Sequence, residues 1–215
     1  MKSYQREFIK FLIESDILCF GQFTLKSGRI SPYFFNAGLF NSGKKISQLG
    51  DFYASKIMDS KIDFDVVFGP AYKGIPIATS TVASLFRNYQ KEAPYCFNRK
   101  EAKKHGEGGN IVGAALEGNV LLVDDVISAG TAVRESMELL KEANANLAGI
   151  VIALDRQERG LGNLSAIQEI EKQHNISVYP IITLNDVVDY LKDENIFTEQ
   201  IEHLNAYRQK YGANI

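Results

Sequence analysis

The sequence predicts an α/β fold, in which a mostly parallel β-sheet is flanked by helices. Three observations support this class. Short runs rich in β-branched residues alternate along the chain with segments of helical periodicity. The run Val120–Val123 is apolar at every position, as expected of a strand covered on both faces. The 215 residues are 45% hydrophobic, which is enough for a single domain over residues 1–215 with its own core.

The first half of the chain begins with an amphipathic helix, predicted over residues 4–15. Two extended segments follow within residues 22–35, on either side of a turn at Ser27–Gly28. Apolar residues at helical spacing predict a helix over residues 42–60, with Ser42 as its N-cap. The remaining predicted elements are a strand over 65–70, a loop and helix over 71–89, and a strand over 93–98.

The second half opens with a polar, charged and glycine-rich stretch over residues 99–110, which predicts a mobile loop. An apolar strand over residues 120–125 and an amphipathic helix over 131–144 come next. The last predicted elements are strands over 147–156 and 177–183 and a helix over 198–212. Strands and helices therefore alternate along much of the chain, which implies a mostly parallel sheet.

Composition and charge exclude several classes of protein. The formal net charge of −2 argues against a general nucleic-acid binder, which usually has a strong basic excess. No apolar run approaches the ~18 residues of a membrane span, and charges interrupt the N-terminal apolar positions that a secretory signal would need. The two cysteines, Cys19 and Cys96, offer neither a disulfide framework nor metal-ligand spacing. We therefore expect a cytoplasmic protein that binds neither nucleic acid nor membranes.

Polar residues follow the ends of four predicted strands. In open parallel sheets, ligands bind beyond the carboxyl ends of the strands. This rule directs attention to the pair Tyr72–Lys73, the segment from Arg99, the acids Asp124–Asp125 and the pair Asp155–Arg156. We expect these four segments to share one site.

The stretch VLLVDDVISAGTAVRE, residues 120–135, combines two adjacent acids with a turn of small residues and a helix start. The turn and the helix N-terminus offer backbone amides and hydroxyl donors, which suit a phosphate monoester. Asp124 and Asp125 cannot bind phosphate, but they accept hydrogen bonds from sugar hydroxyls. A phosphate site beside a diol-binding pair fits a ribose 5-phosphate. The alternative is that the acids merely cap the loop and that residues 128–131 are an ordinary helix start.

Residues 99–105 form a strongly cationic segment. With His105 neutral, four cations and one anion give it a net charge of +3, from Arg99, Lys100, Lys103 and Lys104 against Glu101. A cationic flap complements a polyanion such as pyrophosphate. The alternative is a solvated charged hairpin tip.

Four further residues have side chains that could contact a ligand. Arg156 has the fork that grips a carboxylate with two hydrogen bonds, although it could instead pair with Asp155 or Glu158 at the surface. Phe34 and Phe35 alternate faces if extended, so that one enters the core and the other can lie beside an aromatic ring. Lys26 lies beside a Ser-Gly turn, where a lysine is ordinarily solvent-exposed.

Residues 120–135 resemble the phosphoribosyl pyrophosphate signature of the type I phosphoribosyltransferases. Four other stretches resemble orotate phosphoribosyltransferases, namely residues 23–36, 69–76, 99–109 and 153–160. The resemblance extends from about residue 5 to the C-terminus. Ser128 departs from the family pattern, in which threonine is common, but it keeps the hydroxyl group.

The resemblance implies a pentosyl transfer in de novo pyrimidine (UMP) biosynthesis. Ribose 5-phosphate would pass from phosphoribosyl pyrophosphate to orotate, giving orotidine 5′-phosphate and pyrophosphate. It also implies a small N-terminal hood over about residues 1–40, a C-terminal helix packed on the core, and a cis peptide near Ala71–Tyr72. Mg²⁺ is implied as a cofactor held mainly by substrate oxygens and water. A homodimer is implied, with each flap reaching the partner's active site.

The resemblance assigns roles residue by residue. The implied catalytic residues are Lys26, Lys103, His105 and Asp125. Those implied to contact phosphoribosyl pyrophosphate are Lys26, Tyr72, Lys73, Arg99, Lys100, Lys103, His105, Asp124, Asp125, Val126, Ile127, Ser128, Ala129, Gly130, Thr131 and Ala132. Those implied to contact orotate are Phe34, Phe35, Ser128 and Arg156.

Other functions stay open at this point. The chain could act on another base, such as a purine, although Arg156 and the Lys26 segment argue against this. It could be a regulator that senses phosphoribosyl pyrophosphate without turnover, or a structural component of a larger biosynthetic complex. Regulators of this kind need a nucleic-acid-binding surface, and the sequence has no basic stripe or helix-turn-helix extension.

Overall fold

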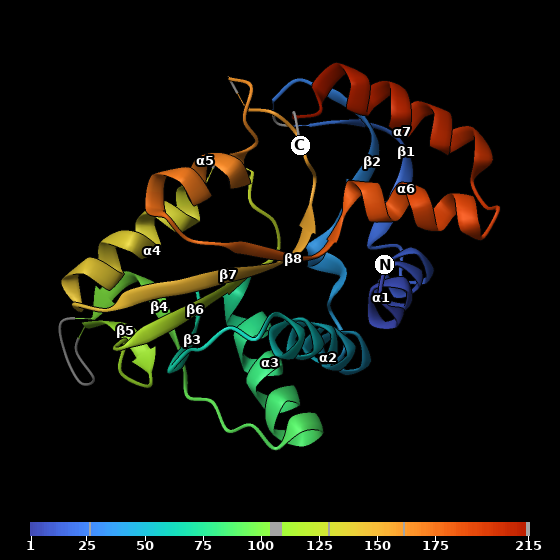
Figure 1. The fold of residues 1–215 in the computed structure, drawn as a ribbon. Coiled ribbons are helices and arrows are strands. Elements are labelled where there is room, and N and C mark those ends of the chain that lie inside the picture. Colours follow the sequence, from blue (N-terminus) through green and yellow to red (C-terminus); the bar gives the residue numbers. More distant parts are fainter. Residues whose placement is uncertain (26, 104–108, 129, 161, 214–215) are drawn as a thin grey trace.

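The computed structural model describes residues 1–25, 27–103, 109–128, 130–160 and 162–213, without the side chains of residues 102 and 103. It has the predicted α/β architecture, with a central sheet between two layers of helices (Figure 1). None of the helices in these ranges has both the length and the apolar character needed to cross a membrane.

The central sheet has six strands in the order β5-β4-β3-β6-β7-β8. All neighbouring pairs are parallel except β4 and β5, which are antiparallel. The order places β3 and β6 in the middle, where their apolar residues are buried on both faces. The strands are β3 (Val66–Gly69), β4 (Tyr95–Lys103), β5 (Gly109–Gly113), β6 (Asn119–Asp124), β7 (Asn146–Asp155) and β8 (Val178–Thr183).

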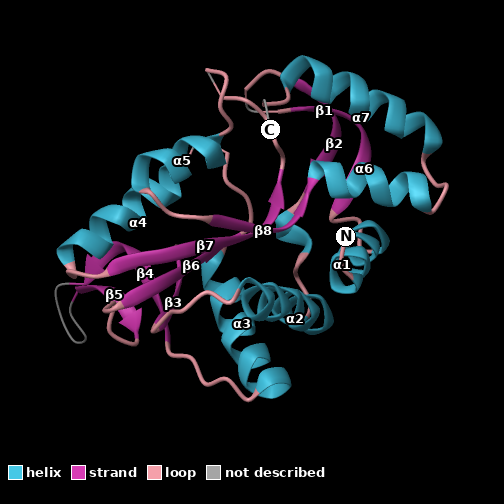
Figure 2. Cartoon of the chain, viewed as in Figure 1, coloured by secondary structure: helices cyan, strands magenta, loops and turns pink. Residues whose placement is uncertain are grey.

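Helices cover both faces of this sheet (Figure 2). Because successive side chains of a strand point to opposite faces, β6 contributes Leu121 and Val123 to one core and Val120 and Leu122 to the other. The first core is closed by α2 (Gly43–Ser60) and α3 (Gly74–Tyr89), and the second by α4 (Thr131–Glu142) and α5 (Ala166–His174). Ser42 caps α2 as predicted, with its hydroxyl accepting from the Lys45 amide.

The N-terminal and C-terminal segments lie together at one end of the sheet (Figure 1). Strands β1 and β2 form an antiparallel hairpin, called here the hood hairpin, around the predicted turn at residues 27–28. Helix α7 packs on β2 and on α6. The elements of this end are α1 (Ser3–Glu14), β1 (Leu18–Thr24), β2 (Ile30–Phe35), the 3₁₀-helix η1 (Ala37–Leu39), α6 (Leu184–Asp193) and α7 (Thr198–Tyr211).

The structure corrects the predicted loop over residues 99–110. Residues 99–103 continue β4, and β5 begins at Gly109, with Lys103 opposite Gly109 in the antiparallel pair. An edge hairpin tolerates a high density of charge because one side of each strand faces solvent. Polarity alone therefore did not distinguish these strand ends from a loop.

Two helices and one strand were not predicted. Strand β5 is short, and glycines stand at both of its ends. Helix α6 follows β8 without a break, because Thr183 is both the last residue of β8 and the N-cap of α6. Helix α5 is short, but its start carries a capping box between Ser165 and Gln168. The capping boxes of α5 and α6 are the signals that could have revealed them.

Candidate active site

The four strand ends selected from the sequence are neighbours in the sheet. Strands β4, β3, β6 and β7 stand side by side, and all four run in the same direction. Backbone hydrogen bonding between β6 and β7 continues one residue beyond the end of β6, since the Ala153 amide donates to the Asp125 carbonyl at 2.9 Å. The segments that begin at Tyr72, Arg99, Asp124 and Arg156 therefore lie on the side of the sheet toward which the carboxyl ends of these strands point.

The acid pair at the end of β6 is held inside the protein. Asp125 is buried, and its amide donates to Asp124 Oδ1 at 2.9 Å. The Tyr53 hydroxyl donates to the Asp124 carbonyl at 2.6 Å, which fixes the strand end on α2. Burial, and then the charge of Asp125, raise the pKa of Asp124 to about 7. The pair thus needs a positive neighbour or hydroxyl donors to hold two full charges near neutral pH.

Lys73 supplies such a neighbour. Its ammonium group donates to Asp125 Oδ2 at 2.6 Å from the turn between β3 and α3. The expected cis peptide is present in this turn, between Ala71 and Tyr72. The Ala71 amide donates to Asn98 Oδ1 of β4 at 2.8 Å, and the Tyr72 side chain is 71% exposed. The turn over residues 71–73 therefore links Asn98 of β4 to the acid pair.

The small-residue turn leads into α4 as predicted. Gly130 is the N-cap residue at φ +67°, and it has no side chain to cap the first-turn amides. A Cβ atom there would lie 3.1 Å from Ile170 Cδ1, in addition to the strain of a positive φ. Ser128 and Thr131 are exposed, whereas Val126, Ile127 and Ala132 are half-buried. Ala129 lies outside the described residues.

The cationic segment begins on β4 and is tied to its surroundings. Arg99 Nη1 donates to the Gly109 carbonyl at 3.3 Å, across the β4–β5 pair. Lys100 Nζ forms an ion pair at 3.2 Å with Glu135 of α4. Lys103 is the last residue of β4, and its side chain is not described. His105 lies outside the described residues.

Phe34 and Phe35 are on strand β2 of the hood hairpin, and Arg156 directly follows β7. Arg156 is 15% exposed and pairs with Glu158, which is 16% exposed. The pairing with Glu158 that the sequence left open therefore exists, but inside the protein and not at its surface. Phe35 is 8% exposed and Phe34 38%, which confirms that one enters the core and the other does not. Lys26 lies outside the described residues.

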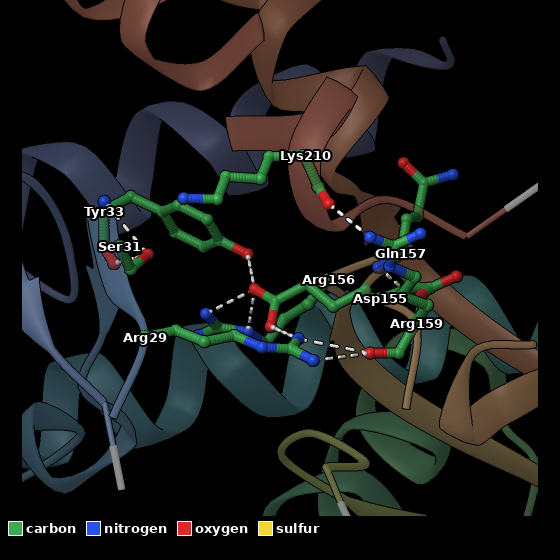
Figure 3. A network of polar contacts seen from close by, with 9 residues as sticks. Arg29, Ser31, Tyr33, Asp155, Arg156, Gln157, Arg159 and Lys210 are labelled. Carbon is green, nitrogen blue, oxygen red and sulfur yellow. Dashed lines mark hydrogen bonds and ion pairs between the residues drawn. The ribbon is translucent and has the colours of Figure 1, made fainter. Parts of the chain in front are cut away.

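Four residues near these candidates were not predicted to belong to the site. Tyr33 lies under the Arg156 guanidinium, Glu158 and Arg29 extend the same cluster, and Glu135 holds Lys100 (Figure 3 shows Arg29, Tyr33 and Arg156). Tyr33 could have been found from strand periodicity, since Ser31, Tyr33 and Phe35 are the inward residues of β2. Glu158 was named from the sequence as a possible partner of Arg156, two positions away, but not as part of the site. The contacts of Arg29 with Glu158 and of Glu135 with Lys100 join distant segments, and no local pattern marks them.

Asp124 and Asp125 have the oxygen donors that suit a hard divalent cation. Within the described ranges, no group of three or more His, Cys, Asp or Glu side chains could hold a metal ion. Asp124 and Asp125 are hard oxygen donors, and Mg²⁺ commonly uses one or two carboxylates together with substrate oxygens and water.

Two surface pockets of about 580 and 570 Å³ lie elsewhere, one against α1 and α2 and one against α4 and α5, and neither contains a predicted site residue.

Comparisons with known proteins agree with this arrangement. A family model described as the phosphoribosyl transferase domain matches residues 39–178. A curated orotate phosphoribosyltransferase of Vibrio parahaemolyticus is 60% identical over 212 residues, which is 99% of this chain and 100% of the relative. The chain belongs to the orotate phosphoribosyltransferase family. Another orotate phosphoribosyltransferase, of Yersinia pestis, is 58% identical over 100% of both chains.

A solved structure shares the fold as well as the sequence. The crystal structure of orotate phosphoribosyltransferase from Francisella tularensis is 45% identical, with a TM-score of 0.87, and the match covers 96% of this chain and 100% of the other. The predicted membership of the orotate phosphoribosyltransferase family and the predicted fold class are thus both confirmed.

Proposed function

We propose that this chain transfers ribose 5-phosphate from phosphoribosyl pyrophosphate to orotate. The observation that carries the proposal is that a turn with uncapped backbone amides, an acid pair and a half-buried arginine follow two neighbouring strands, β6 and β7. The C–O bond to pyrophosphate breaks and a C–N bond to the base forms at the same ribose carbon. Pyrophosphate and orotidine 5′-phosphate are the products.

The ribose 5-phosphate end of the substrate is assigned to the turn after β6. The uncapped amides of α4, behind Gly130, and the hydroxyls of Ser128 and Thr131 bind the phosphate. Asp124 and Asp125 accept hydrogen bonds from the ribose hydroxyls. Their negative charge also lies near the cation that develops on the sugar as the bond to pyrophosphate breaks, as in glycosyl transfer generally.

The pyrophosphate end is assigned to Lys73 and the cationic segment. Lys73 pairs with Asp125 in this structure, and its ammonium group has further N–H donors for the departing phosphate oxygens. Tyr72, Arg99, Lys100, Lys103, His105 and Lys26 complete the anion-binding set. Asp124 and Asp125 are the residues that would face a bound magnesium ion, which would neutralise part of the pyrophosphate charge.

The base is assigned to the space between Arg156 and the hood hairpin. Arg156 grips the orotate carboxylate, and uracil and purine bases have no such group. Phe34, Phe35 and Ser128 are the other residues proposed to contact the base. We also propose that the chain forms homodimers, in which each flap completes the partner's site.

Catalysis in this scheme is mainly electrostatic, because fixed cations stabilise the departing pyrophosphate. Replacing Lys103 by alanine should lower kcat by orders of magnitude, since loss of one preorganised donor typically costs ~2.7–4 kcal/mol in the transition state. Steady-state kinetics on the purified variant, with circular dichroism to check its fold, would measure this. A folded Lys103→Ala variant with near wild-type kcat would contradict the assignment.

The first experiment is a direct assay. Purified protein, magnesium and phosphoribosyl pyrophosphate are mixed with orotate, and the loss of orotate's ultraviolet absorbance is followed, with uracil and hypoxanthine in parallel. We expect turnover with orotate and its loss on addition of EDTA. Turnover with another base instead of orotate would overturn the base assignment. Tight binding of phosphoribosyl pyrophosphate without any turnover would favour a regulator.

A further inference from the structure

The Arg156 guanidinium is held on one face and along one edge. Its central carbon lies over the Tyr33 ring, 4.7 Å from the ring centroid, in a cation–π contact (Figure 3 labels both residues). Its Nε and Nη2 atoms both donate to Glu158 Oε1, at 3.0 and 2.6 Å. These two nitrogens form the side edge of the guanidinium. The contacts therefore fix the plane of the group and its rotation within that plane.

The end edge of the same guanidinium, between Nη1 and Nη2, is not the edge that meets Glu158. Among the described residues, Arg156 donates to a carboxylate only from Nε and Nη2, and the other polar group beside it is the Tyr207 hydroxyl, which is buried and forms no geometric hydrogen bond. Both nitrogens of this edge carry N–H groups that can bind the two oxygens of a carboxylate in parallel. A carboxylate bound there would not displace Glu158.

Glu158 is itself fixed by three other partners. The Tyr33 hydroxyl donates to its Oε1 at 3.3 Å, and burial raises the pKa of Tyr33 well above its ordinary value, which keeps that donor protonated. Arg29 Nη1 lies 3.7 Å from Glu158 Oε2. The backbone of Glu158 forms an isolated β-bridge with Gly212, just beyond α7. Contacts from the hood hairpin and from the end of α7 thus position one carboxylate.

The charges of the cluster favour a further anion. Two cations, Arg29 and Arg156, face one anion, Glu158, so that the group has a net charge of +1. Arg29 also donates to the Arg159 carbonyl from both Nη atoms at 3.2 Å, which keeps it in the cluster. A half-buried group with one uncompensated positive charge is well suited to a single substrate carboxylate.

We propose that Glu158 is a positioning residue for substrate recognition, which orients the Arg156 fork so that its end edge meets the carboxylate of the base. This inference rests on the proposed function, because it takes orotate as the ligand of Arg156. Glu158 acts through Arg156 and does not itself touch the substrate. Its carboxylate would repel that of orotate if Arg156 did not separate them.

Three variants test the proposal by steady-state kinetics. Glu158→Ala removes the acceptor, so that Arg156 can rotate about its side chain, and KM for orotate should rise about tenfold or more. KM for phosphoribosyl pyrophosphate should change little. Glu158→Gln keeps an acceptor for Nε and Nη2 and should restore most of the orotate affinity. Asp51→Ala is the matched control, since it removes the carboxylate partner of another arginine, Arg87, outside the site.

A double-mutant cycle separates positioning from simple stabilisation. In an Arg156→Ala background, Glu158→Ala should cause no further rise in KM for orotate, because the group that it positions is absent. Equal effects of Glu158→Ala in both backgrounds, an unchanged KM in the single variant, or equal defects in the alanine and glutamine variants would each overturn the proposal. Wild-type turnover of orotate, measured alongside, tests the proposed function independently of all three results.

Discussion

At the scale of single residues, Asp124 should give the protein a measurable pH dependence of stability. Its pKa is raised to about 7 in the folded chain, by burial and then by the charge of Asp125. The folded state therefore keeps a proton that the unfolded state releases, and stability from this group is lost as the pH rises from about 4 to about 7. Relative to the Asp124→Asn variant, the wild type should lose on the order of 2 kcal/mol of unfolding free energy between pH 5 and pH 8.

Urea denaturation of both proteins across that range measures the difference, and a difference that does not vary with pH would contradict the prediction. Asp125→Asn provides the control. It removes the neighbouring charge that is the second cause of the raised pKa, so the pH dependence contributed by Asp124 should move to lower pH.

The sequence predicted which residue types act in the site, but not which side chains hold them in place. Arg156 and the adjacent acids Asp124 and Asp125 could be identified because the chemistry of each side chain is evident from its residue type. Tyr33 and Glu158 could not be read together, because they are 125 positions apart and meet only after folding. Side-chain contacts between segments depend on the packing of whole elements, which a linear pattern does not encode.

At the scale of elements, the close crossing of α2 and α3 depends on Gly50. A Cβ atom at this position would lie 2.4 Å from the Ser80 carbonyl oxygen, which is backbone and cannot turn aside. Alanine ordinarily favours a helix over glycine by ~1 kcal/mol. We nevertheless expect Gly50→Ala to lower the unfolding free energy by about 1–3 kcal/mol, because the helices must separate.

Gly43 is the matched control in the same helix. A Cβ atom there would have no heavy atom within 4 Å, so Gly43→Ala should leave stability unchanged or raise it slightly. Chemical denaturation of both variants measures the contrast. Equal stability of the Gly50→Ala and Gly43→Ala variants would show that the crossing can relax without cost.

Several elements with a strong period or a continuous apolar run were predicted correctly, but helix α6 was missed although its buried residues Leu184, Val187, Val188 and Leu191 follow a helical period. Strand β6 and helices α2 and α4 have such patterns and lie close to their predicted bounds. Strand β5 takes its place from pairing with β4, and the start of α6 is hidden because no turn residue separates it from β8. Tertiary pairing and shared boundary residues, more than propensity, determine these elements.

At the scale of the whole molecule, the proposed homodimer has a direct test. If each flap acts in the partner's site, Asp125→Asn and Lys103→Ala chains should each be inactive alone but complement each other when mixed. In a mixed dimer, one site carries both defects and the other carries none. Half of the dimers in an equal, randomly reassorted mixture are mixed, so about one quarter of wild-type activity should return.

Activity assays after denaturation and joint refolding of the two variants measure this recovery. Refolding each variant alone is the control. A mixture with no more activity than its components would show that Lys103 and Asp125 of the same chain serve the same site.

The contacts of the hood hairpin with residues 158–159, the first of which pairs with Gly212, also have a consequence for folding during synthesis on the ribosome. Arg29 and Tyr33 emerge long before the partners that lie 130 and 125 positions later, and Gly212 emerges later still. Contacts so distant in sequence form slowly, whereas β3 to β7 can pair as they emerge. A nascent chain should therefore complete its ribose-phosphate side first, and become able to discriminate between bases only in the last steps of its folding.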